Sequence, residues 1–295
     1  MITDPEYRQD PWRESIAQML SLFEKVVVVY GRREDADLLV DVFGTEVKDG
    51  RLVCVYLDWP QPSWSYEELP RHLNAGLAKA REIGLDWVVK FDIDNAVHEV
   101  DSMALRNKIA EADRFGRWVA VLEKYQFFSP GLCYQKGRIP IVVNLKKPIA
   151  YGFDQGRYTD LCQPIEWDGT TTASVNGRDT DIPAGKSIGK DRTYDTGVHV
   201  WNYDYTWKTY DRAQELLYHF DRSHAMFWGK GYSGKALDEI TPESAMADFL
   251  ALAQGRFKKM ILSKSVLAHP KHFIPGLRSL TGEQFGHGFW GKLSK

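Results

Sequence analysis

Residues 86–94 read DWVVKFDID, an apolar run that ends in two carboxylates. Such a run is typical of a buried strand, and it places Asp92 and Asp94 at the carboxyl end of that strand. In an open parallel sheet, ligands bind at the carboxyl ends of the strands. Residues two apart on a strand point to the same side, so we expect both carboxylates to face one point.

The stretches around this segment alternate between helical and strand-like patterns. KVVVVYG (25–31) reads as a strand buried on both faces, and RLVCVYLDW (51–59) predicts a second strand. Apolar residues recur at helical spacing in 12–23, 34–43, 66–83 and 101–114. This order predicts an α/β fold with a mostly parallel, Rossmann-like sheet, right-handed crossovers and flanking helices.

The second half of the sequence is organised differently. Strand-like patterns lie at 118–128, 138–145 and 197–205, and helical patterns at 207–227 and 242–262. Residues 155–196 are rich in Gly, Thr and Asp with little periodicity, which predicts a long functional or mobile loop. We expect one domain over 1–205, with halves at about 12–115 and 116–205, and a helical, basic extension over 206–295.

Composition narrows the class of protein. The chain has 295 residues, 43% of them hydrophobic, and a formal net charge of −2, which excludes a generally basic nucleic-acid binder. Its three cysteines form no CxxC pair, which favours a reducing compartment. No apolar run reaches the about 18 residues that span a membrane, and the polar N-terminus is unlike a signal peptide. We expect a cytoplasmic protein without a membrane span.

The acidic pair predicts a metal site. Mg²⁺ and Mn²⁺ prefer oxygen ligands and bridge phosphates, so a cation on Asp92 and Asp94 would neutralise a departing diphosphate. For so short a motif, two solvated loop carboxylates are the alternative. The position after WVVKF favours the metal site, because an acidic pair at a buried strand end needs a partner.

Three segments around this pair resemble glycosyltransferase family 2, in the order that the family has them. They are ESIAQMLSLFEKVVVVYGRREDAD (14–37), RHLNAGLAKAREIGLDWVVKFDID (71–94) and FDIDNAVHE (91–99), so the resemblance covers roughly the first 115 residues. It implies a GT-A fold and a metal-dependent enzyme. Such an enzyme moves a sugar from a nucleotide-sugar donor, with UDP- or GDP-sugars favoured, to a hydroxyl acceptor with inversion.

The resemblance also implies roles for particular residues. Asp35 takes the place of the aspartate that contacts the nucleoside. Arg71 and Asn74 fall on the pattern of the helix that precedes the metal strand. Asp92 and Asp94 correspond to the DxD-like metal pair of the family.

The family further implies a histidine as third metal ligand, late in the domain. GVHVWNYDYTW (197–207) offers His199, for which a buried histidine bonded to the backbone is the alternative. His98 competes with it. The implied cofactor is Mn²⁺ or Mg²⁺.

Basic side chains are candidates for binding the diphosphate of the donor. GKSIGKDR (185–192) lacks the spacing of a phosphate loop, and we interpret it as a flexible lid over the donor. The predicted donor site consists of Tyr30, Arg32, Asp35, Arg71, Asn74, Lys90, Asp92, Lys190 and Arg192.

An inverting enzyme needs a general base near the acceptor hydroxyl. The candidates are Asp154 in IAYGFDQGR, Glu166 and Asp168 in PIEWDG, and Asp195 in TYDTG. Asp154 is the first choice, because it follows a predicted strand and YGFDQGR distantly resembles an acceptor-side segment of the family. A solvated loop carboxylate is the alternative for each of the four.

One departure from the family concerns the strand that normally precedes the ESI helix. Only MITDPEYRQDPW (1–12) stands before that helix here. The strand is therefore lost, very short or replaced from elsewhere, which leaves the nucleobase preference open.

Two other functions remain open. In the first, the acceptor is a hydroxymethylated pyrimidine of DNA, as for some viral enzymes of this type. The basic stretches RFKK (256–259), KHFIPGLRS (271–279) and GKLSK (291–295) would then contact the phosphate backbone, unless they form a solvated tail. The second is a nucleotidyltransferase or a non-catalytic nucleotide-binding module, although the glycine-rich signature of nucleotidyltransferases is absent and both aspartates are present.

Overall fold

The first two long strands pair in parallel, as the sequence predicts. In the computed structural model, α2 (Trp12–Leu22) leads to β1 (Val26–Tyr30), and α3 (Arg33–Lys48) connects β1 to β2 (Leu52–Tyr56). Val26, Val28 and Val29 of β1 are buried, so the run of valines forms a strand because both of its faces are covered. The structure describes residues 4–59, 67–154, 162–175, 177–257, 260–262 and 268–284.

The third predicted strand is short and lies in a different sheet. β3 (Trp87–Val89) pairs antiparallel with β6 (Leu132–Asn144), and residues 90–94 leave the strand before β4 (Asn95–Val97) begins. The main sheet has the order β12-β6-β5-β11-β4 and is mixed, so the prediction of a mostly parallel sheet is wrong for it. The reason is the long hairpin of β5 (Val119–Ser129) and β6, whose short turn requires antiparallel pairing.

The stretch predicted as a long loop forms a second sheet. β7 (Ile149–Asp154), β8 (Gln163–Glu166), β10 (Arg178–Ser187) and β9 (Thr172–Val175) pair in that order. The turn η1 (Lys190–Arg192) then leads into β11 (Thr193–Asn202). For the described part of 155–196, the loop prediction is therefore wrong, and the expected lid is divided between the end of β10 and η1. Glycines permit the close packing: a Cβ at Gly152 would collide with the carbonyl oxygen of Pro183.

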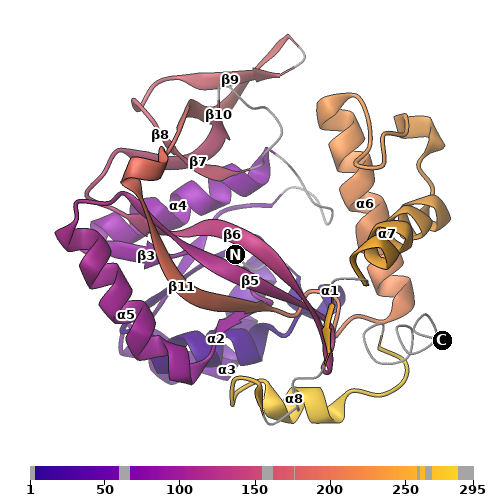
Figure 1. The fold of residues 1–295 in the computed structure, drawn as a ribbon, viewed down its shortest axis with the longest axis horizontal. Helices are drawn as coiled ribbons and strands as arrows, with labels where there is room; N and C mark the ends of the chain where they lie inside the picture. Colours follow the sequence, from indigo (N-terminus) through magenta and orange to yellow (C-terminus); the bar gives the residue numbers. More distant parts are fainter. Residues whose placement is uncertain are drawn as a thin grey trace.

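Helices cover both sides of the first strands (Figure 1). α2 contacts β1 and β4, α3 contacts β1 and β2, and α5 (Glu99–Arg114) contacts β11 and β5. α4 (Glu68–Glu82) lies between β1 and the second sheet, because it contacts β1, β2, β7 and β10. The largest core cluster joins α2, α3, β1 and the middle of the main sheet around Ile16, Leu39 and Val142.

The C-terminal part is helical, but it also contributes to the main sheet. α6 (Tyr210–Trp228) and α7 (Pro242–Phe257) pack together beside the sheets, and β12 (Met260–Leu262) extends the edge of β6 (Figure 1). The basic stretch 271–279 contains α8 (Ile274–Ser279), whereas 258–259 and 291–295 lie outside the described residues. In the described parts of the chain, no helix combines the length and the apolar character that crossing a membrane requires.

Candidate active site

The acidic pair lies in the turn between β3 and β4 rather than on a strand. The Lys90 Nζ donates to both carboxylate oxygens of Asp92, at 2.8 and 2.9 Å. Burial alone would raise the pKa of Asp92, but Lys90 and then Lys124 hold it well below its usual range. The Asp92 side chain is still 45% exposed, so its ionised carboxylate is accessible to a ligand.

Asp94, two residues further on, has the opposite electrostatic character. Its residue exposure is only 9%, and burial raises the pKa of its carboxyl to about 7, with further contributions from Asp204 and Asp92. In one orientation of its amide, Asn95 donates to Asp92 at 3.3 Å, and in the flipped orientation it donates to Asp94 at 3.3 Å. The two carboxylates therefore lie close to each other, and a negative charge on Asp94 is unfavourable there.

A buried group of charges adjoins Asp94, and sequence reasoning missed it. The Lys208 Nζ, at the start of α6, donates to Asp10 Oδ1 at 2.5 Å and to Asp204 Oδ1 at 3.1 Å. Arg8 donates to Asp10 at 2.9 Å. No local pattern identifies these residues, because Asp10 and Lys208 are almost 200 positions apart in the sequence. The only signal in the sequence is a charged residue between aromatic ones, Lys208 in WKTYDR (207–212).

Tyr151 on β7 and Cys162, just before β8, lie near Lys90 and Asp92. Burial raises the pKa of Tyr151 on β7 and that of the Cys162 thiol, and the charge of Asp92 adds to both shifts. Both groups are thus neutral and electrostatically close to the acidic turn. Sequence reasoning assigned neither of them a role.

Three predicted donor residues lie at the carboxyl end of β1 and in the following segment. The Tyr30 ring lies 5.5 Å from the Tyr56 ring, and Arg32 forms an ion pair with Asp4. Asp35 is only 2% exposed and accepts from the backbone N–H groups of Arg32 at 3.2 Å and Asp4 at 3.3 Å. It therefore holds the start of α3 and the N-terminal segment, and a contact with a nucleoside would require Asp4 to move.

The two predicted donor residues on α4 lie on the side of this helix that faces the second sheet. Asn74 donates to the Tyr151 carbonyl and accepts from the Tyr151 N–H, both at 2.8 Å, as a neighbouring strand would. Arg71 is exposed and pairs with Glu68 at 3.1 Å. Both residues line a cavity of about 340 Å³ between α4 and β10, together with Trp167. The structure does not bring either of them to the acidic turn.

The predicted residues around η1 form a separate group. Arg192 pairs with Glu166 at 2.8 Å and lies over the Trp118 ring, 4.2 Å from its centroid. Lys190 is exposed in the same turn. Asp195 pairs with Arg138 at 2.6 Å near the start of β11, whereas the acidic turn meets the other end of that strand. These residues are not gathered around Asp92 and Asp94.

Of the remaining base candidates, Asp154 is better placed than Asp168. Asp168 caps a surface turn, and the hydroxyl and N–H of Thr171 lower the pKa of its carboxyl, which makes it a weak base. Asp154 accepts from the Ser187 hydroxyl and lies three residues beyond Tyr151 on β7, the strand that reaches Asp92 electrostatically.

His199 is held away from the pair. Tyr203 N–H donates to the Asp94 carbonyl at 2.8 Å, and His199 lies four residues earlier on β11, about 13 Å along an extended strand. Its Nε2 lies 3.0 Å from Glu123, and its ring stacks on Tyr125 at 4.3 Å. His98 caps α5 by accepting from the Val100 N–H.

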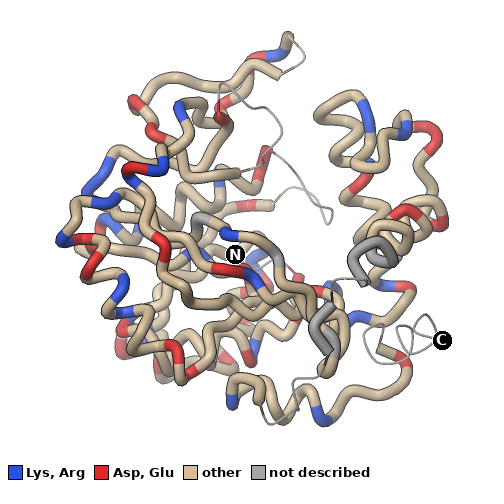
Figure 2. The backbone as a smooth tube through the Cα atoms, in the orientation of Figure 1, with Lys and Arg blue, Asp and Glu red and all other residues tan. Residues whose placement is uncertain are grey.

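The residues of the acidic turn suit a cation that is held by two carboxylates better than a cation that is held by three protein ligands. Within the described ranges, no three His, Cys, Asp or Glu side chains converge on one point. Mg²⁺ is commonly held by one or two carboxylates together with substrate phosphates, which Asp92 and Asp94 match in number and chemistry. Lys, Arg, Asp and Glu positions are interspersed along the described chain rather than separated into an acidic and a basic part (Figure 2).

The sequence matches no known protein-family model, and no curated protein matches it either. The family resemblance therefore stays an expectation that rests on the three motifs alone.

Proposed function

We propose that this protein is a metal-dependent glycosyltransferase that uses a nucleotide-sugar donor. The observation that carries the proposal is the acidic turn. Asp94 is buried, and this burial, together with the negative charges of Asp204 and then Asp92, raises its pKa to about 7. A divalent cation is the partner that relieves this unfavourable charge.

Asp92 and Asp94 would hold Mg²⁺ or Mn²⁺ in this turn, and the cation would neutralise the diphosphate that leaves the sugar. Lys90, which now neutralises Asp92 at 2.8 Å, is in reach of the same phosphates as a donor of charge-assisted hydrogen bonds. The buried Tyr151 would exclude water on the side of the second sheet.

In the acceptor step, Asp154 would take the proton of the acceptor hydroxyl. The hydroxyl oxygen then forms the new glycosidic bond to the anomeric carbon as the bond to the diphosphate breaks, which inverts the configuration. What supports this role is the position of Asp154, at the end of β7 and three residues beyond Tyr151. Its contact with the Ser187 hydroxyl leaves it able to accept a further proton.

The test is hydrolysis and transfer with a panel of UDP- and GDP-sugars, with Mn²⁺, with Mg²⁺ and with a chelator. We expect metal-dependent turnover by the natural protein. Asp94→Asn should lower it on the order of 100-fold or more, because a neutral amide holds the cation poorly. Asp154→Asn should lower kcat while donor binding, measured calorimetrically, stays within about twofold.

The matched control is Asp41→Asn, an exposed aspartate in the middle of α3. It should retain natural turnover. If no donor turns over with any metal, or if Asp94→Asn is as active as Asp41→Asn, the acidic turn is not the active site.

A further inference from the structure

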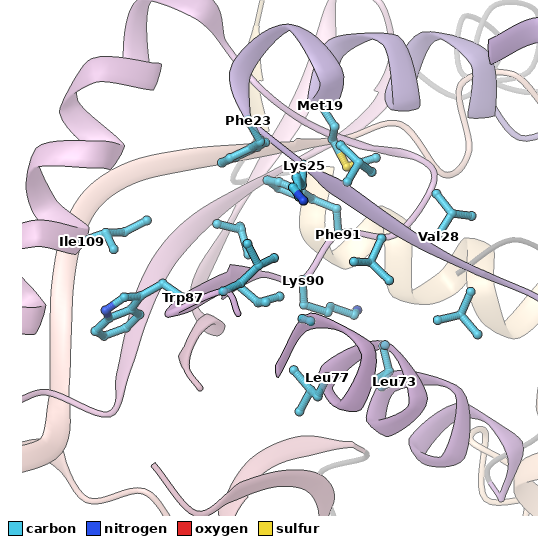
Figure 3. Close-up of a pocket in the computed structure, with 18 of the residues that line it drawn as sticks. Met19, Phe23, Lys25, Val28, Leu73, Leu77, Trp87, Lys90, Phe91 and Ile109 are labelled. Carbon is cyan, nitrogen blue, oxygen red and sulfur yellow. The ribbon is translucent and has the colours of Figure 1, made fainter. Parts of the chain in front are cut away.

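A cavity of about 410 Å³ lies between β1 and β3 (Figure 3). α2 and α5 close one side of it with Met19, Phe23 and Ile109, and α4 closes the other with Leu73 and Leu77. We call this space the β1–β3 cavity. Its volume and its mostly apolar lining are those of a small-molecule site, which typically measures about 300–1,000 Å³ and contains a few polar groups.

Three charged residues of the lining are in contact with solvent. Lys25, Arg106 and Asp113 line the cavity, and all three are exposed. The Asp113 carboxylate also accepts from the Trp87 indole at 3.0 Å, and the Arg106 guanidinium donates to the Leu22 carbonyl. Water therefore solvates these charges, and a ligand in the interior does not have to compensate them.

Two further polar residues of the lining have partners within the protein. The ring nitrogens of His72 lie 2.7 and 2.9 Å from the carbonyl oxygens of Leu57 and Glu68. The Lys90 Nζ donates to Asp92 at 2.8 Å, and this ion pair neutralises its charge. Neither side chain therefore requires a polar or charged group of a ligand.

Tyr151 also lines the cavity, and its polar group has no such partner. Its residue exposure is 2%, and its hydroxyl forms no hydrogen bond with any residue that the structure describes. A buried hydroxyl without a partner costs free energy. Burial raises the pKa of Tyr151, so the hydroxyl is neutral and can donate a hydrogen bond. Since the charge of Asp92 adds to this shift, the hydroxyl lies toward the Lys90 end of the cavity.

We propose that the β1–β3 cavity binds a neutral apolar molecule with one oxygen-containing head group, a hydroxyl or a carbonyl, which bonds to the Tyr151 hydroxyl. The apolar body matches the side chains of α2, α4 and β1. The single head-group oxygen matches the single unpartnered hydroxyl of the lining. A carboxylate head is disfavoured, because Lys90 is already neutralised by the ionised Asp92. The inference does not rest on the proposed function, since it requires neither a metal nor a sugar donor.

The test compares two probes of similar shape, 2-naphthol and naphthalene, by equilibrium dialysis against the full chain. Only 2-naphthol has the head group. We expect the natural protein to bind 2-naphthol about tenfold more tightly than naphthalene, because the two hydroxyls satisfy each other. Tyr151→Phe should lose this preference and still bind naphthalene, since the variant keeps the ring and removes only a hydroxyl that has no partner among the described residues.

Two further variants locate the binding. Tyr56→Phe removes a partly exposed hydroxyl outside the lining and should keep the preference for 2-naphthol. Gly76→Leu should abolish the binding of both probes, since even a Cβ at Gly76 approaches Val29 at 3.2 Å. If Gly76→Leu does not fold, Tyr151→Phe still decides the question. Equal binding of the two probes by the natural protein, an unchanged preference in Tyr151→Phe, or no binding of 2-naphthol would each overturn the proposal.

Discussion

At the scale of single residues, Lys208 is a buried charge that depends on its partners. Its side chain is 3% exposed and that of Asp10 is 2% exposed, and the two charges are 2.5 Å apart. Burial alone would lower the pKa of Lys208, but Asp10 and Asp204 hold it above its usual value. Removing one member of a buried pair leaves the other charge without compensation, which costs about 3–5 kcal/mol.

We therefore expect Lys208→Met to lower the free energy of unfolding by about 3 kcal/mol, measured by urea denaturation. The double variant Lys208→Met with Asp10→Asn should recover part of this loss, because Asp10 then carries no charge and Arg8, whose side chain is 26% exposed, can turn to water. A single variant within about 0.5 kcal/mol of the natural protein would mean that Arg8 alone compensates the charge of Asp10.

The sequence predicted part of this neighbourhood. Asp92 and Asp94 stand out because carboxylates follow an apolar run, and Lys90 is their close neighbour in the chain. Asp10, Asp204 and Lys208 could not be found in this way, because what unites them is tertiary contact between distant segments. His199 shows the converse. A histidine suits a metal site, yet it is Tyr203, four residues later, that bonds to Asp94, so His199 lies further back along β11.

At the scale of elements, Asn74 shows how a predicted ligand can have a structural role. Its amide satisfies both backbone groups of Tyr151 and so attaches α4 to the edge of β7. Asn74→Leu would leave a buried N–H and a buried C=O without partners. We expect a loss of about 2–3 kcal/mol in the free energy of unfolding, seen by thermal or chemical denaturation.

Arg71→Leu provides the comparison one turn earlier on α4, since Arg71 is exposed and bonds only to Glu68 among the described residues. It should change stability by less than about 0.5 kcal/mol. If instead Asn74→Leu keeps its stability and loses donor binding in the calorimetric assay, the donor role that the motif implied for Asn74 is the correct one.

Elements with strong periodicity were predictable, and those that depend on distant partners were not. α2, α4, β1, β5 and α6 lie within a few residues of their predicted bounds, since apolar spacing or a continuous apolar run identifies them. β10 contains Pro183 and Gly185, which speak against a strand, and it forms because β7, β8 and β9 supply its hydrogen bonds. The β3 segment is interrupted after Val89, because the chain turns there to bring Asp94 toward Tyr203.

At the scale of the whole molecule, the N-terminal segment 4–11 ties three parts together. Asp4 contacts Asp35 after β1, Asp10 reaches Lys208, and Gln9 accepts from the Thr209 N–H at the start of α6 at 2.8 Å. Tyr7 lies between these anchors. The segment therefore links the carboxyl edge of β1, the acidic turn and the C-terminal helices.

Tyr7 is the position at which this connection can be tested. Its hydroxyl donates to Glu215 on α6, and the guanidinium of Arg212 lies 3.6 Å from the centroid of its ring. A charge-assisted hydrogen bond and a cation–π contact together contribute about 2 kcal/mol. We expect Tyr7→Ala to lower the free energy of unfolding by about that amount and to speed hydrogen exchange in α6 more than in β5.

The reason for this asymmetry is that β5 stays paired with β6 and β11 when α6 opens, whereas α6 depends on α7 and on the N-terminal segment. Tyr7→Phe keeps the ring over Arg212 and should show about half of the loss. Val100→Ala, which truncates an exposed side chain on α5, should show almost none. Faster exchange in β5 to the same extent as in α6 would mean that the chain opens as one unit and that the segment does not specifically hold the C-terminal helices.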